Sequence, residues 1–200
     1  MSKGVVIGLT GPTGAGKSTA GEAFARLGAK VIDCDGLGNE ILETSPCKEE
    51  LTAAFGASIL GRDGTVSRPA LAQAAFSSPE GAKKLNEITH PAILARMESQ
   101  IRAFLQEGAP AVVVDAALLF ESGADQACQA TVSVTAAPEI RLARIMRRDA
   151  ISEEEAKARM RAQKDAEYYE SRSDYCLDGG GSPEDLAAAV EQLYHKILER

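Results

Sequence analysis

Short apolar runs alternate with helical patterns along most of this chain. Runs rich in β-branched residues, which are typical of buried strands, cover Val5–Thr10, Lys30–Asp33, Ala111–Asp115, Thr131–Thr135 and Tyr175–Leu177. The stretches that separate them have helical spacing, and helices of this kind connect parallel strands. The pattern therefore predicts an α/β fold in which helices flank a parallel five-stranded sheet.

The interval between the second and third strands is much longer than one helical crossover needs. Its pattern predicts short helices at 46–55, 68–76 and 79–88, a turn at 61–64, and a long helix that begins at Pro91, because proline is favoured in a first helical turn. We therefore expect a single domain over residues 1–200, with a helical insertion at 36–108.

A glycine-rich segment follows the first strand directly. Residues Gly11–Ser18 fit the pattern G-x-x-x-x-G-K-[ST], the P-loop. In such a loop the backbone N–H groups cradle phosphates, Lys17 adds a positive charge, and the Ser18 hydroxyl can bind Mg²⁺. A helix that begins at Ser18 would add its dipole. We expect a triphosphate to be held by Gly11, Thr13, Gly14, Ala15, Gly16, Lys17, Ser18 and Thr19.

Carboxylates stand at the ends of two other predicted strands. Asp33 and Asp35 follow the second strand, and in open parallel sheets the carboxyl ends of the strands line the ligand crevice. One of them could orient an acceptor hydroxyl and accept its proton, or both could cap the next helix. Asp115 closes a Val-Val-Val run, the form of a strand-end carboxylate that holds Mg²⁺.

The charge distribution narrows the choice of partners. The net charge of −7 argues against nucleic acid as a partner. The segment 141–164, however, holds eight Lys/Arg against four Asp/Glu, a balance of +4 that leaves −11 for the remainder. Its arginines, Arg144 and Arg148 among them, could form a lid over a nucleotide or a solvated surface.

His90, before Pro91, could contact an anionic substrate or close a turn.

The chain shows no signal peptide and no apolar run of membrane length, and its four cysteines form no C-x-x-C pair. We therefore expect a cytoplasmic protein with free thiols, without a membrane partner, that is a monomer or a weak homo-oligomer.

Several segments, taken in order, are more specific than the P-loop alone. They are Ile7–Gly11 leading into that loop, Asp33-Cys34-Asp35, Phe55–Leu60 with Asp63-Gly64, Arg68, Leu85-Asn86 up to His90-Pro91, Leu118–Gly123, and Arg148-Asp149 followed by Ser152–Glu154 and Gln163. In this order and spacing the chain resembles the dephospho-coenzyme A kinase family along nearly its whole length.

The resemblance implies a fold, a reaction and a set of site residues. The fold would be a P-loop kinase core of the nucleoside-monophosphate-kinase type, with an acceptor-binding region at 36–108 and a lid at 138–165. The reaction would use ATP and Mg²⁺ to phosphorylate the ribose 3′-hydroxyl of dephospho-coenzyme A, giving coenzyme A and ADP. The resemblance makes Asp35 the base, Lys17 and Ser18 the phosphate and metal ligands, Arg144 and Arg148 catalytic lid residues, and His90, Phe120 and Glu121 acceptor contacts.

Two alternatives remain at this point: another small-molecule or nucleoside kinase of the same fold, and a nucleotide-binding switch. The chain has no N-K-x-D base-reading element, which makes a GTP-dependent switch less favoured.

The family commonly has Asn-Gly near the last strand, whereas Asp178 is followed here by three glycines. If that segment lies by the adenine, we expect weak purine discrimination, which Gly179→Asn would sharpen.

Overall fold

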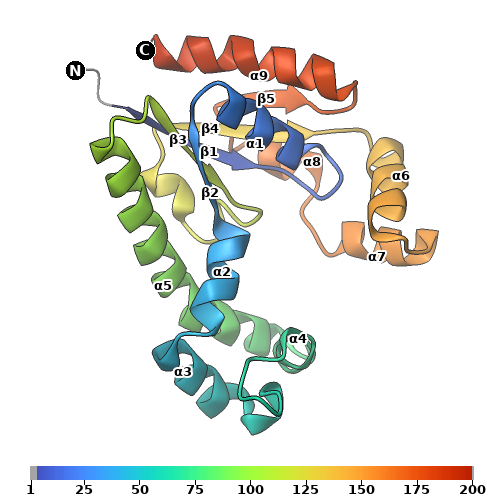
Figure 1. The fold of residues 1–200 in the computed structure, drawn as a ribbon. Coiled ribbons are helices and arrows are strands. Elements are labelled where there is room, and N and C mark those ends of the chain that lie inside the picture. Colours follow the sequence, from blue (N-terminus) through green and yellow to red (C-terminus); the bar gives the residue numbers. More distant parts are fainter. Residues whose placement is uncertain (1–3, 200) are drawn as a thin grey trace. The chain divides into compact units, whose positions relative to one another are not determined.

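A computed structural model describes residues 4–199 of the protein. Its sheet has five strands: β1 (Val5–Thr10), β2 (Lys30–Asp33), β3 (Ala111–Asp115), β4 (Ala130–Thr135) and β5 (Tyr175–Asp178). All neighbouring strands are parallel, in the order β2-β3-β1-β4-β5 (Figure 1). The predicted α/β fold with a parallel five-stranded sheet is confirmed.

The helices are α1 (Lys17–Arg26), α2 (Cys34–Leu42), α3 (Ser45–Phe55), α4 (Arg68–Ala75), α5 (Pro79–Gln106), α6 (Pro138–Asp149), α7 (Glu153–Arg161), α8 (Ala166–Glu170) and α9 (Pro183–Leu198). Short 3₁₀ turns, η1 and η2, lie at Ala57–Ile59 and Ala124–Ala127. Contacts divide the chain into two compact units: the first takes in the chain up to Asp33 and from Gln100 onward, and the second is Cys34–Ser99.

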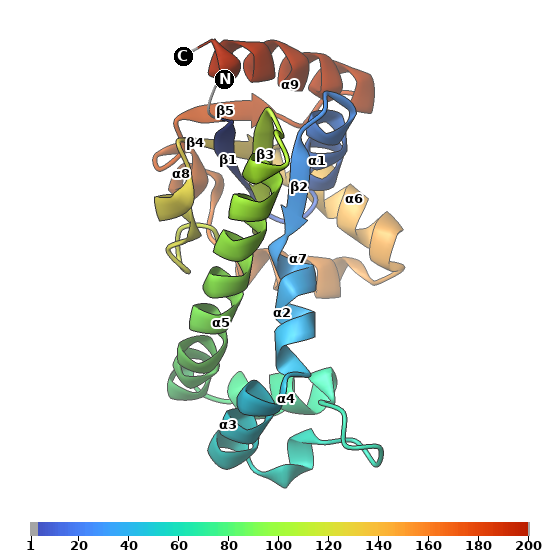
Figure 2. The same cartoon turned by 60° about the vertical axis from the view of Figure 1, so that its left-hand side comes forward.

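The core of the first unit follows from strand alternation, because successive side chains of a strand point to opposite faces of a sheet. One face is covered by α1 and α9, which lie side by side in Figures 1 and 2. The apolar cluster on this face includes Ile7, Leu9, Phe24, Val113, Val132, Val134, Val190 and Ile197. On the other face, a Cβ added at Gly8 would lie 2.8 Å from Leu119 Cδ2, so Leu119 packs closely against β1.

The second unit is helical and has a smaller core of its own. Its buried cluster is formed by Cys47, Leu51, Ile59, Val66 and Leu71, which come from α3, η1, α4 and the segment before α4, where Val66 forms an isolated bridge with Leu60. The expected insertion, 36–108, covers most of this unit and the C-terminal turns of α5 beyond it.

The prediction of a helix break before Pro91 is wrong. Helix α5 runs without interruption from Pro79 to Gln106 with Pro91 inside it. Proline removes one backbone donor from a helix, but the apolar positions on both sides keep the helical period, and Met97 and Ile101 are buried. The Thr89 hydroxyl also donates to the Leu85 carbonyl (2.9 Å) within this helix.

Among residues 4–199 no helix is long and apolar enough to cross a membrane.

Candidate active site

The P-loop between β1 and α1 has a backbone that only glycine accommodates at two points. Gly11 and Gly14 have φ values of 143° and 78°, which L side chains rarely adopt. A Cβ at Gly11 would lie 2.2 Å from the Val134 carbonyl oxygen, and one at Gly14 would lie 2.8 Å from the Arg141 carbonyl oxygen. The loop is therefore pressed against β4 and α6, which explains the first fixed glycine of the motif, Gly11, and also the glycine at residue 14, a position that the motif leaves open.

Lys17 and Asp115, which the sequence analysis assigned separately, form an ion pair in the structure. Lys17 begins α1 and Asp115 ends β3, and both side chains are mostly shielded from solvent (19% and 16% exposed). They meet because β1 and β3 are neighbours, with Leu9 opposite Asp115. Ser18, the next residue of α1, is exposed, and Thr19 is half-buried.

Thr13 of the P-loop is bonded by three side chains from the segment 141–163. Its N–H donates to Gln163 Oε1 (2.8 Å), and its carbonyl oxygen accepts from Arg141 Nε (2.9 Å). The Thr13 hydroxyl accepts from Arg148 Nη2 (3.3 Å). The predicted lid segment therefore contacts the P-loop directly in this structure. Gln163 has no charge and lies outside the motif, so only the family resemblance drew attention to it.

The Arg144 guanidinium donates to carbonyl oxygens of two different segments. Nη1 lies 2.6 Å from the Gly179 oxygen and 3.4 Å from the oxygens of Gly14 and Ala15. Nη2 lies 3.1 Å from the Gly181 oxygen. In this arrangement Arg144 joins the P-loop to the segment between β5 and α9.

The prediction that Gly179→Asn would place a useful amide side chain at this position is wrong, because the structure has no room for a side chain there. A Cβ at Gly179 would lie 1.8 Å from the Ala15 carbonyl oxygen, a backbone atom of the P-loop. Any side chain there would force the P-loop and the β5–α9 segment apart, so the glycine serves this close approach.

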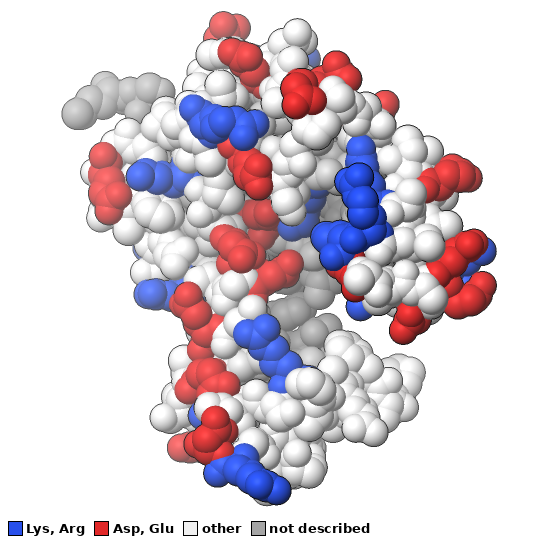
Figure 3. All heavy atoms as spheres, turned by 45° about the vertical axis from the view of Figure 1, so that its right-hand side comes forward, with Lys and Arg blue, Asp and Glu red and all other residues white. Residues whose placement is uncertain are grey.

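Basic and acidic side chains are paired at the end of α6. Asp149 accepts from Arg148 Nε (2.7 Å) and also forms an ion pair with Arg159 of α7. The hydrogen bond from Arg148 and the nearby guanidinium charges lower the pKa of Asp149. Figure 3 shows Lys and Arg side chains gathered on the α6–α7 side of the first unit, with acidic side chains beside them.

Phe120 and Glu121, expected to contact the acceptor, lie next to Tyr168 of α8. The rings of Phe120 and Tyr168 meet edge to face, with centroids 6.4 Å apart. Burial and the Glu121 carboxylate raise the pKa of Tyr168, and the Arg172 guanidinium stacks 4.1 Å from its ring centroid. Sequence reasoning did not single out Tyr168, because a tyrosine in a short polar helix carries no distinctive signal.

Two expected site residues belong to the second unit. Asp35 is exposed in the first turn of α2, where a carboxylate also interacts favourably with the helix dipole. His90 is half-buried on α5, and burial lowers the pKa of its imidazole, so the ring is neutral at pH 7. In the first unit, Asp33 is the exposed last residue of β2 and pairs in register with Asp115.

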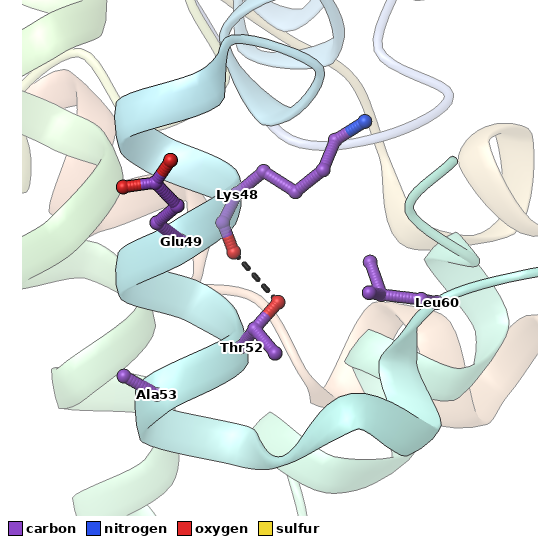
Figure 4. Close-up of a pocket in the computed structure, with 5 residues that line it drawn as sticks. All are labelled: Lys48, Glu49, Thr52, Ala53 and Leu60. Atoms are coloured by element: carbon purple, nitrogen blue, oxygen red, sulfur yellow. Dashed lines mark hydrogen bonds between the residues drawn. The ribbon is translucent and has the colours of Figure 1, made fainter. Parts of the chain in front are cut away.

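A shallow pocket of about 380 Å³ lies within the second unit, lined by Lys48, Glu49, Thr52, Ala53 and Leu60 (Figure 4). The Lys48 ammonium group donates to the Gly64 carbonyl oxygen (3.0 Å) and pairs with Glu43 (2.9 Å). Because these bonds already occupy the cation, and because the lining includes no expected site residue, we do not assign a substrate to this pocket.

Comparisons with known proteins show to which family the chain is similar. The family model described as dephospho-CoA kinase matches residues 5–185. A dephospho-CoA kinase of Syntrophotalea carbinolica is 40% identical over 97% of this chain and 92% of its own length. A crystal structure of a Thermus thermophilus protein has a TM-score of 0.83 and 34% identity, covering 96% of this chain and 97% of its own.

A solved dephospho-CoA kinase from Campylobacter jejuni has a TM-score of 0.72 and 28% identity, with 97% of each chain covered. These similarities extend over nearly the whole chain and do not favour a nucleotide-binding switch or a kinase for another acceptor. The chain belongs to the dephospho-coenzyme A kinase family, enzymes that use ATP in the last step of coenzyme A biosynthesis.

Proposed function

We propose that the P-loop of the first unit holds the triphosphate of ATP for transfer to the ribose 3′-hydroxyl of dephospho-coenzyme A. The observation that supports this most directly is the P-loop geometry at the end of β1, with Lys17 beginning α1 and paired to Asp115. The backbone N–H groups and the positive end of α1 stabilise phosphate charge, and the Lys17 ammonium adds to it. The remaining P-loop contacts would come from Gly11, Thr13, Gly14, Ala15, Gly16, Ser18 and Thr19.

We assign the proton-accepting role to Asp35. Its carboxylate is exposed on the first turn of α2, so a substrate hydroxyl can reach it. As a general base it would orient the 3′-hydroxyl and take its proton while the new phosphate bond forms. The acceptor-binding region would be 36–108, with His90 as a neutral contact. In the first unit, Phe120 and Glu121 are proposed as further acceptor contacts.

The segment 138–165 is proposed as the lid, with Arg144 and Arg148 as its functional arginines. Arg148 is partly exposed and bonds both Thr13 and Asp149, so its guanidinium is held beside the P-loop. From there it can neutralise charge on the phosphoryl group. Arg144 would act on the same reaction through the backbone of the P-loop, which it holds.

Mg²⁺ is the metal that a kinase of this type would use, and the chain offers suitable oxygen donors. The exposed Ser18 hydroxyl and the Asp115 carboxylate are hard ligands of the kind Mg²⁺ prefers, and phosphates and waters usually complete its shell. When bound, the ion would neutralise charge on the phosphate groups.

The remaining proposals concern the setting in which the enzyme works. The four cysteines of the described segment, Cys34, Cys47, Cys128 and Cys176, form no disulfide bond, which suits a reducing cytoplasm. The acidic net charge of −7 disfavours nucleic acid as a partner. We propose a protein that acts on ATP and dephospho-coenzyme A without a membrane partner, as a monomer or a weak homo-oligomer.

The direct test measures ADP release with dephospho-coenzyme A, adenosine, shikimate and a nucleoside monophosphate as acceptors, and identifies the product by mass spectrometry. We expect turnover with dephospho-coenzyme A and a product one phosphate heavier, whose 3′-phosphate is removed by a 3′-nucleotidase. Faster turnover with another acceptor would contradict the proposal.

A further inference from the structure

The backbone of Thr13 is unusual because side chains from outside the P-loop bond both of its polar groups. Gln163 accepts from its N–H and Arg141 donates to its carbonyl oxygen. Arg144 then donates to the carbonyl oxygens of the next two residues, Gly14 and Ala15. Three consecutive carbonyls of the loop are thus bonded by two arginines of one helix, α6.

These contacts determine where the N–H groups of the loop point. In a trans peptide the carbonyl and the N–H of the same unit point in opposite directions, and residues 4–199 contain no cis peptide. When Arg141 holds the Thr13 carbonyl toward α6, the Gly14 N–H points away from α6. The same reasoning turns the Gly16 N–H away from α6 when Arg144 holds the Ala15 carbonyl. N–H groups of a P-loop have to face the phosphates.

The Arg141 side chain is buried. It is 6% exposed, and within the described residues its Nη2 is buried without a hydrogen-bond partner. Burial of a cation costs free energy, and an unpaired donor adds to that cost. A methionine of similar length would pack at this position without the penalty. The buried arginine therefore lowers stability, which points to a role in function.

We propose that Arg141 and Arg144 are positioning residues that hold P-loop carbonyls toward α6 and thereby direct the N–H groups of Gly14 and Gly16 toward the ATP phosphates. Gln163 is a third positioning residue, which fixes the Thr13 backbone by accepting from its N–H. The proposal assigns roles to Arg141 and Gln163 and makes Arg144 act through the loop. It rests on the proposed function only in that the loop binds the phosphates of ATP.

The first test compares Arg141→Met with Arg147→Met, a matched change at an exposed position of the same helix. Dissociation constants for ATP and for adenosine are measured by calorimetry, and the melting temperature is measured without nucleotide. We expect Arg141→Met to weaken ATP binding about tenfold or more, as for a lost charge-assisted hydrogen bond, with adenosine binding unchanged and the melting temperature unchanged or raised. Arg147→Met should change none of these quantities.

The second test uses Gln163, where a matched pair separates the lost acceptor from lost packing. Gln163→Met removes the acceptor for the Thr13 N–H, whereas Gln163→Glu keeps an oxygen at that position. We expect the methionine variant to weaken ATP binding several-fold more than the glutamate variant, while the KM for the acceptor stays unchanged. If Arg141→Met does not fold, the two Gln163 variants still test the proposal.

Unchanged ATP affinity in Arg141→Met, or equal weakening of ATP and adenosine, would overturn the proposal. So would a glutamate variant of Gln163 that binds ATP as weakly as the methionine variant. Because binding of ATP alone is measured, a failed assay with dephospho-coenzyme A would count against the proposed reaction and leave this test intact.

Discussion

Side chains from distant segments bond the backbone of the P-loop, whereas the second unit is held chiefly by a small apolar cluster. Around the loop, polar bonds reach from Arg141, Arg144 and Gln163 across more than a hundred residues of sequence. In the second unit, the bonds from Lys48 to Gly64 and Glu43 span at most sixteen residues and lie at the surface. The comparison indicates that precise backbone orientation is required in the first unit and general packing in the second.

The largest expected effect comes from Lys17→Ala. The Lys17 ammonium lies at the P-loop and pairs with Asp115 outside the apolar cluster, so the fold should persist while phosphate stabilisation is lost. We expect kcat to fall by about a thousandfold or more, as when a key electrostatic contact to a transition state is removed. Steady-state ADP release and circular dichroism check this, with Lys84→Ala, an exposed change on α5, as the control. Comparable turnover in a folded Lys17 variant would contradict the assignment.

A core substitution in the second unit should separate stability from ATP binding. Leu51 is fully buried in the apolar cluster of that unit, so Leu51→Ala should lower the free energy of unfolding by about 3 kcal/mol. Urea unfolding measures this loss, and Leu198→Ala, at an exposed position on α9, should change it little. Because the P-loop belongs to the first unit, we expect the ATP dissociation constant to stay unchanged and the KM for dephospho-coenzyme A to rise. A weakened ATP affinity would contradict the division of roles.

The smallest expected effect concerns the beginning of α7. Ser152 and Glu155 form a capping box, in which the Ser152 hydroxyl accepts from the Glu155 N–H (3.3 Å). Loss of such a cap costs about 1 kcal/mol of helix stability. Ser152→Ala should therefore increase amide hydrogen exchange in α7 and leave α9, which has its own box at Ser182, unaffected. Equal increases in both helices would show that the effect is not local.

The two regions also differ in what the sequence could predict. The strands were predicted within one residue because their apolar runs are short and bounded, and the P-loop because its motif is fixed by backbone geometry. The helix break at Pro91 was predicted wrongly, since local propensity cannot show that packing on both sides maintains α5. The contacts of Arg141 and Gln163 with Thr13 join residues more than a hundred positions apart, and no local pattern reports such pairs.

The roles proposed for Asp35, His90, Phe120 and Glu121 come from the family resemblance and from the positions of these residues. Asp33 is the last residue of β2, Asp35 follows two residues later in α2, and both side chains are exposed. Their side-chain chemistry is identical, so only kinetics of single substitutions can separate the base from its neighbour.

A single-turnover experiment can show whether the first unit holds ATP while Asp35 accepts the proton of the 3′-hydroxyl. The rate of phosphoryl transfer to dephospho-coenzyme A is measured for Asp35→Asn and for the matched variant Asp33→Asn, together with the ATP dissociation constant of each. We predict that Asp35→Asn slows transfer by about 10² or more with ATP affinity unchanged, whereas Asp33→Asn has little effect. Slow transfer in Asp33→Asn with a normal rate in Asp35→Asn would contradict the assignment of Asp35 as the base.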